Sequence, residues 1–325
     1  MFRFFVALLL ALCTPLLYVH AQFSSADPLS ITISPEYPRP YEVVTVTPNS
    51  TLIDLSATTR KYSVNGKNVS VDAGAQSIPV TMGGPGEKTT ISISAVFGGK
   101  TYRKDLVIRP ADVALVVEPL STAHPFYKGA LGLAPEGRVR LIAIPDLRTS
   151  ASVRSDPSAL SYTWRFGNKI LQGESGIGKN VLTASGPMRY RSAQISVVVA
   201  TPDSAVVARA QTLLEPVDPL IRVYPSSPLL GIDFDHSLIG SYVLSGSEES
   251  FRGVAYFFAG DPTLAWTVSG QGSGADKDVT VRTTGSGSGT ASLSLTARLA
   301  QTHQSVTNSL NVVFGTQKNT NVFGF

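Results

Sequence analysis

One short pattern occurs three times in this chain and constrains its fold more than any other feature. In each copy an aromatic residue lies in a run of alternating residues that ends in a glycine-containing turn. The three pairs are Tyr62 with Gly66, Trp164 with Gly167, and Trp266 with Gly270. An alternating run favours a β-strand with one buried face, and a tight glycine turn between two such runs predicts a hairpin. The recurrence therefore predicts three copies of one strand-rich unit.

A second segment follows each hairpin at a similar distance and also alternates. The three segments are Ile91–Ala95, Ile195–Val199 and Leu293–Ala297. Proline-containing boundaries at Arg109-Pro110 and Glu215–Pro219 separate the units. We therefore expect domains at residues 22–111, 112–216 and 217–315, followed by a tail at 316–325. Units of about 100 residues are long enough for each to bury its own core.

Short strands separated by turns, with one aromatic residue on a central strand, predict an all-β chain of three tandem immunoglobulin-like β-sandwich domains. We expect Tyr62, Trp164 and Trp266 to be structural core residues that fill the space between two sheets packed about 10 Å apart. Only 15% of residues are charged, below the roughly 25% of ordinary soluble proteins. Serine, threonine and glycine replace them, which suits short strands and tight turns.

The Trp-to-Gly hairpins at Trp164–Gly167 and Trp266–Gly270, with the Ile-Ser-Val segment at Ile195–Val197, carry a family resemblance. On these residues the chain resembles the tandem immunoglobulin-like, PKD-like modules of bacterial exported proteins. Trp164 is followed by Arg165-Phe166-Gly167-Asn168, where the PKD turn has Asp-Phe-Gly-Asp-Gly. The resemblance implies spacing, adhesion or assembly in place of catalysis, so we expect a non-enzymatic protein.

The N-terminus has the pattern of a secretory signal peptide. Arg3 precedes the apolar run Phe4–Val19, and Val19-His20-Ala21 offers small residues before a cleavage point. A retained membrane anchor is the alternative, but the run is shorter than the ~20 residues of a spanning helix and contains Pro15. Cleavage at residue 21 would also remove Cys13, the only cysteine. We therefore expect an exported protein, in the periplasm, at the cell surface or outside the cell, without disulfides or a thiol nucleophile.

Charge and motifs nominate few ligands. The net charge is +4, but the basic residues are scattered and form no stripe that would neutralise many phosphates, so nucleic acid is not an expected partner.

The run Gly173–Lys179 matches G-x-x-x-x-G-K, yet Asn180 follows it where a phosphate-binding loop has Ser or Thr. No helix is predicted after it, so we expect a structural loop and no cofactor. The expected partners are other envelope or surface proteins and glycans, with membrane contact only through an uncleaved leader.

Three further candidates for binding remain open. Asp233 and Asp235 would share one face of a strand and are a candidate calcium site, the alternative being a solvated edge whose charges discourage strand pairing. In the tail, Val322, Phe323 and Phe325 form an apolar end that is either a docking strand or a terminus packed on its own domain. Carbohydrate binding is an alternative function, because sugars stack on aromatic rings. Its candidate rings are Tyr190, Tyr242, Tyr256 and Phe257.

Overall fold

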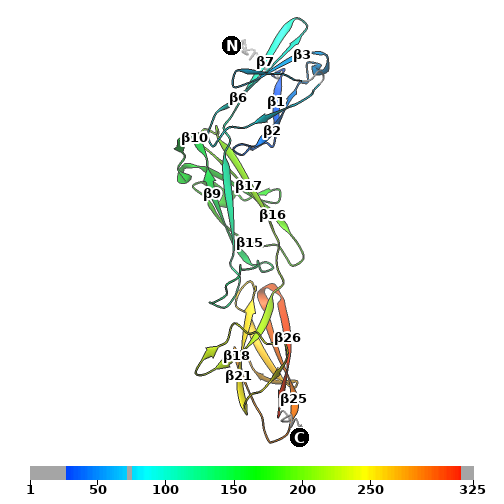
Figure 1. Ribbon diagram of the computed structural model, residues 1–325, viewed down its shortest axis with the longest axis vertical. Helices are drawn as coiled ribbons and strands as arrows, with labels where there is room; N and C mark the ends of the chain where they lie inside the picture. Colours follow the sequence, from blue (N-terminus) through cyan, green and yellow to red (C-terminus); the bar gives the residue numbers. More distant parts are fainter. Residues whose placement is uncertain (1–26, 72–74, 316–325) are drawn as a thin grey trace, which may run out of the picture. The chain divides into compact units, whose positions relative to one another are not determined.

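The computed structural model describes residues 27–71 and 75–315 (Figure 1). The predicted leader with Cys13, and the tail residues Val322, Phe323 and Phe325, lie outside the described residues. The chain divides into two compact units, and the larger one includes residues 107–315. Among the described residues, no helix has both the length and the apolar character that crossing a membrane requires.

The first seven strands form two sheets that each bury one face. Strands β1 (Ser30–Ser34), β2 (Val43–Asn49) and β5 (Ile78–Thr81) form one sheet in the order β1-β2-β5. Strands β3 (Thr59–Val64), β4 (Lys67–Val69), β6 (Thr89–Phe97) and β7 (Lys100–Ile108) form another in the order β4-β3-β6-β7, and η1 (Leu55–Ala57) precedes β3. The predicted hairpin turn is present: Asn65 and Gly66 have φ values of 50° and 78°, the left-handed conformation that a two-residue hairpin requires.

The next strands form a sandwich around one hydrophobic cluster. Strands β8 (Asp112–Pro119), β9 (Arg138–Asp146) and β15 (Val181–Ser185) pair in the order β15-β9-β8. Strands β12 (Ser161–Phe166), β13 (Lys169–Ile170), β16 (Ala193–Ala200) and β17 (Val207–Leu214) pair in the order β13-β12-β16-β17, and β14 (Gly176–Ile177) also pairs with β12. A small hairpin, β10 (Arg148–Ser150) with β11 (Val153–Arg154), and the 3-10 turns η2 (Pro157–Ala159) and η3 (Gln172–Glu174) complete it. Leu141 from one sheet and Trp164 from the other belong to the same core cluster.

The last strands repeat this plan. One sheet contains β18 (Leu220–Ser227), β19 (Gly231–Ile232), β21 (Glu248–Tyr256) and β24 (Asp278–Arg282) in the order β19-β18-β21-β24. The other contains β20 (Gly240–Val243), β22 (Thr263–Val268), β23 (Gln271–Gly274), β25 (Gly289–Leu299) and β26 (Gln304–Phe314) in the order β20-β26-β25-β22-β23, and η4 (Ala300–Thr302) joins β25 to β26. Phe251 on the first sheet and Trp266 on the second share one core cluster.

These sheets confirm the predicted all-β fold of tandem immunoglobulin-like β-sandwiches. The structure adds short strands that the sequence pattern did not indicate, such as β5, β15 and β24. The exact domain boundaries stay predictions. One expectation was wrong: Asp233 and Asp235 do not share a face of a strand, because β19 ends at Ile232 and Phe234 and Asp235 form a turn.

Candidate functional site

The three aromatic residues of the repeated pattern lie in the interior. The exposed fractions of Tyr62, Trp164 and Trp266 are 3%, 0% and 1%. The indole Nε1–H of Trp164 donates to the backbone oxygen of Lys179 at 2.8 Å, and that of Trp266 donates to the backbone oxygen of Asp276 at 3.0 Å. Buried indoles generally need such a partner. These residues hold the sandwiches together and present no surface for a ligand.

The glycine-rich run Gly173–Lys179 forms a loop that closes on itself beside Trp164. The side-chain Nζ of Lys179 donates to the backbone oxygen of Gly173 at 3.2 Å, and the Ser175 hydroxyl accepts from the backbone N–H of Trp164 at 3.0 Å. Strand β15 follows where a phosphate-binding loop has a helix, so no helix N-terminus faces the loop. The loop therefore covers a tryptophan and does not cradle a phosphate.

A concave site lies on the outer face of strands β18 and β21. Because side chains alternate along a strand, Leu220, Arg222 and Tyr224 point away from the core that contains Ile221 and Val223. Leu220 pairs across the strands with Tyr256, which lies on the same outer face. This face is the floor of a cavity of about 980 Å³, which we call the aromatic pocket. Its lining includes His124, Phe126, Tyr127, Lys128, Arg222, Tyr224, Leu230, Ile232, Asp233, Phe234, Asp235, Tyr256 and Phe257.

The first wall of the aromatic pocket is the segment that carries His124 to Lys128, and Thr122 fixes it in place. The backbone N–H of Thr122 donates to the oxygen of Phe258 at 3.2 Å, and the N–H of Phe257 donates back to the oxygen of Thr122 at 2.8 Å. The Thr122 hydroxyl accepts from the N–H of Phe258 at 3.0 Å. Three hydrogen bonds thus attach this segment to the chain just beyond the end of β21.

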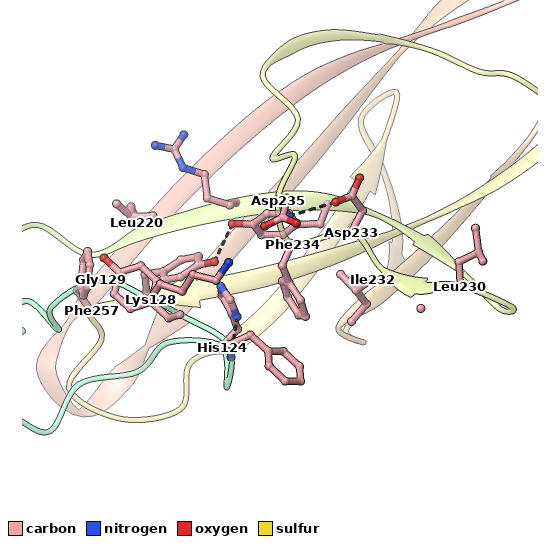
Figure 2. Close-up of a pocket in the computed structure, with 16 residues that line it drawn as sticks. His124, Lys128, Gly129, Leu220, Leu230, Ile232, Asp233, Phe234, Asp235 and Phe257 are labelled. Carbon is pink, nitrogen blue, oxygen red and sulfur yellow. Dashed lines mark hydrogen bonds between the residues drawn. The ribbon is translucent and has the colours of Figure 1, made fainter.

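The second wall is the turn after β19, which brings Phe234 against His124. Figure 2 shows Phe234 pointing from the turn toward the His124 ring, and the two rings stack with centroids 4.2 Å apart and planes inclined by 4°. His124 also meets Tyr256 edge-on at 5.7 Å. The hydroxyls of Tyr224 and Tyr256 share a hydrogen bond of 2.7 Å. These contacts form an aromatic cluster outside the sandwich core.

The Asp233 carboxylate is occupied by its own turn. It accepts from the backbone N–H of Asp235 at 3.1 Å and lies 2.9 Å from Nδ1 of His236. The hydrogen bond with His236 holds the pKa of the Asp233 carboxyl below its usual value. Across residues 27–71 and 75–315, no group of three or more His, Cys, Asp or Glu side chains is placed to hold a metal ion. The calcium site at Asp233 and Asp235 stays a proposal, because no such group among the described residues supplies a third ligand of these residue types.

Two cations that line the aromatic pocket have no counter-ion in the described part of the chain. Arg222 and Lys128 form no ion pair and no side-chain hydrogen bond there. By contrast, Arg252 on the same outer face pairs with Asp278 through two bonds of 2.5 and 2.6 Å. The Phe126 ring at the rim is 70% exposed. The pocket therefore offers ring surface together with two cations that have no direct partner, beside the carboxylates of Asp233 and Asp235.

The candidate sugar-stacking rings are only partly assembled in one place. Tyr256 and Phe257 both line the aromatic pocket. Tyr190 lies elsewhere, 81% exposed and stacked under Arg189 with a centroid distance of 4.7 Å. Tyr242 meets Phe251 edge-on, and burial raises the pKa of its hydroxyl to about 12. The sequence analysis did not select His124, Phe126, Tyr127 and Phe234 as site residues. The aromatic residues and histidines that lie close together in His124–Tyr127 and Asp233–His236 could have indicated them.

His124 gives the aromatic pocket a predicted pH dependence. Its Nδ1 accepts from the backbone N–H of Phe126 at 3.1 Å, which requires an unprotonated Nδ1, and burial lowers the pKa of the imidazole. The unfolded chain therefore binds the proton more readily. The stability that the neutral ring contributes is present above about pH 6.5 and is lost as pH falls through the lower folded pKa. We expect melting temperatures to fall less between about pH 8 and about pH 5 in His124→Gln than in the native protein.

The control for this pH prediction is His303→Gln, which changes an exposed histidine outside the aromatic pocket. Its profile should follow that of the native protein. Parallel melting profiles for His124→Gln and the native protein would contradict the prediction.

Comparison with known proteins adds similarity at the level of fold. No protein-family model matches the chain, and no curated protein matches it either. Among solved structures, it is similar to immunoglobulin domains 1–5 of Sidekick-1, with 10% identity, a TM-score of 0.32, and coverage of 87% of this chain and 58% of that one. A second is the three N-terminal domains of the bacteriophage RB49 Highly Immunogenic Outer Capsid protein, with 12% identity, a TM-score of 0.25, and coverage of 89% and 99%. A third is the central fibronectin-III array of RIM-binding protein, with 10% identity, a TM-score of 0.26, and coverage of 89% and 96%.

Proposed function

We propose that this is a non-enzymatic exported protein of the cell envelope or cell surface, in which tandem immunoglobulin-like modules have a structural or adhesive role. The observation that carries the proposal is the succession of sandwiches with hydrophobic cores of their own, an arrangement that suits spacing and adhesion. In the aromatic pocket the hydroxyls of Tyr224 and Tyr256 bond to each other, and the Asp233 carboxylate bonds to His236. Groups that are already paired in this way suit a fixed binding surface better than proton transfer. The predicted leader supports export.

Fractionation of cells that produce the full chain tests the location. We expect the protein in the envelope or the medium, shortened at its N-terminus by the length of the leader, and sensitive to protease added outside the cell if it reaches the surface. A full-length cytoplasmic product would contradict the proposal. A pull-down from the native envelope would then identify the partner, which we propose to be another envelope or surface protein.

The apolar end of the tail is proposed as a docking strand for such a partner. Deletion of Val322–Phe325 should release the protein from the cell surface, because the edge of a partner's sheet would lose its added strand. Retention is measured by comparing the cell-bound and released fractions with those of a variant that replaces the polar residues Thr316–Asn321 by a Gly/Ser spacer of equal length. Equal retention after the deletion and in the native protein would remove the docking hypothesis.

Saccharide binding is the second candidate function, and the aromatic pocket favours it specifically. Its volume of about 980 Å³ lies within the range of about 300–1,000 Å³ that small-molecule sites occupy. A protein partner would instead need about 800 Å² of well-packed surface on each side. Rings and charged groups share the lining, which matches an amphipathic ligand with an apolar ring face and polar edges.

A further inference from the structure

The aromatic pocket also indicates the class of saccharide, an inference that rests on the second candidate function. Arg222 projects from the floor on β18, and Lys128 lies on the wall that Thr122 anchors. Neither cation is neutralised within the described residues, whereas Arg252, on the neighbouring strand, is held by Asp278. A ligand that supplies an anion would complete this arrangement, because charge-assisted hydrogen bonds to a guanidinium are among the strongest in proteins.

Asp233 and Asp235 balance the two cations in formal charge, but neither is paired with them. Asp233 is engaged by the Asp235 N–H and by His236, so its oxygens already have donors. Asp235 is exposed and its carboxylate is the one acidic group in the lining that accepts no hydrogen bond in the described chain. Neither carboxylate forms an ion pair with Arg222 or Lys128, so both cations keep their donors for a ligand carboxylate. The Asp235 carboxylate can accept from ligand hydroxyls, which a sugar has and a simple anion lacks.

The rings complete the chemistry. Phe126 and Phe234 lie with centroids 6.0 Å apart and planes inclined by 49°, and Phe126 presents most of its surface to solvent. His124 stacks on Phe234 and holds that ring in place. The two phenylalanine rings are therefore positioned before a ligand binds. We propose that the aromatic pocket binds an acidic saccharide, with its carboxylate on Arg222 and Lys128 and a sugar ring against Phe126.

The test begins with the full mature chain on an array of uronic-acid and sialic-acid glycans printed beside neutral ones. The tightest acidic glycan is then compared by titration calorimetry with its methyl ester, which keeps the sugar and removes the charge. We expect binding to the acid and loss of at least about tenfold in affinity for the ester, because a hydrogen bond to a charged group contributes roughly 1.5–3 kcal/mol. Added salt should weaken binding to the acid.

Two pocket variants, each with a matched control, locate the site. Arg222→Met should weaken binding by about tenfold or more, whereas Arg298→Met on β25 makes the same charge change outside the pocket and should leave the affinity unchanged. Phe126→Ala should weaken binding by about two- to tenfold, and the exposed Tyr190→Ala should have no effect. Thermal melts of all four variants establish that each is folded. Binding of polyglutamate, an acidic peptide, to the same variants is measured for comparison.

Binding of the acid alone, with loss only in the pocket variants, supports the proposal. Binding of neutral glycans only would overturn the acidic assignment and leave the saccharide function in place. Binding to no glycan would overturn both. Equal weakening by Arg222→Met and Arg298→Met, or polyglutamate binding that is equally strong and equally dependent on Arg222, would also overturn the proposal, because net charge or a peptide ligand would then explain it.

Discussion

Trp164→Ala should lower the free energy of unfolding of the sandwich formed by β8 to β17 by about 3–5 kcal/mol. The side chain is fully buried in a cluster that draws on both sheets. Its removal leaves a cavity that Val197, the β-branched residue opposite it on β16, cannot fill. It also leaves the Lys179 carbonyl without the indole donor, which adds the cost of a lost hydrogen bond.

Denaturant titrations followed by far-ultraviolet circular dichroism measure this loss. Because the chain contains several sandwiches, we expect more than one transition, and only the one that belongs to this sandwich should move. Trp164→Phe should lower the free energy of unfolding by less, because phenylalanine keeps most of the apolar contact but not the hydrogen bond. The control is Ile177→Ala on β14, where the side chain is 73% exposed and the change should be within about 0.5 kcal/mol. A shift for Trp164→Ala as small as the Ile177 shift would mean that the tryptophan does not support the core.

The repeated pattern predicted the fold because burial acts on residues close together in sequence. The alternating segments Ile91–Ala95 and Ile195–Val199 lie within strands β6 and β16 of the structure. The Asn65-Gly66 dipeptide likewise predicted its turn, since few residues adopt two successive left-handed conformations. Short strands such as β15 were missed because they have few residues, and their pairing with β9 is decided by tertiary contact.

The aromatic pocket could not be derived in the same way, because it joins three segments that are far apart in sequence. His124 and Phe234 are stacked only because Thr122 bonds to the chain after β21 and because the Asp233 turn reverses the chain after β19. The sequence pattern placed Asp233 and Asp235 on a strand, since alternating acidic residues fit a strand face. The Asp233 carboxylate instead bonds to the Asp235 N–H, a local interaction that competes with strand pairing.

Gly253→Ala should lower the free energy of unfolding of the last sandwich by about 1–3 kcal/mol. Gly253 is buried on β21, and a Cβ atom there would lie 2.5 Å from Cδ2 of Leu295 and 3.1 Å from Cζ2 of Trp266. Real Cβ contacts are essentially never as short as the first distance, so Leu295 or the strand must shift. The absence of a side chain at this position makes room for the tryptophan.

A double-mutant cycle separates this clash from a general effect of alanine. Leu295→Val shortens the side chain that the new methyl group would meet, so Gly253→Ala should cost less in the Leu295→Val background than in the native one, a coupling that two independent sites would not show. Gly272→Ala on β23 is the control, because no atom lies within 4 Å of the added Cβ. Its effect on the same denaturation transition should be small. Strictly additive costs for Gly253→Ala and Leu295→Val would contradict the packing explanation, because a Cβ confined by Leu295 must respond when that side chain is shortened.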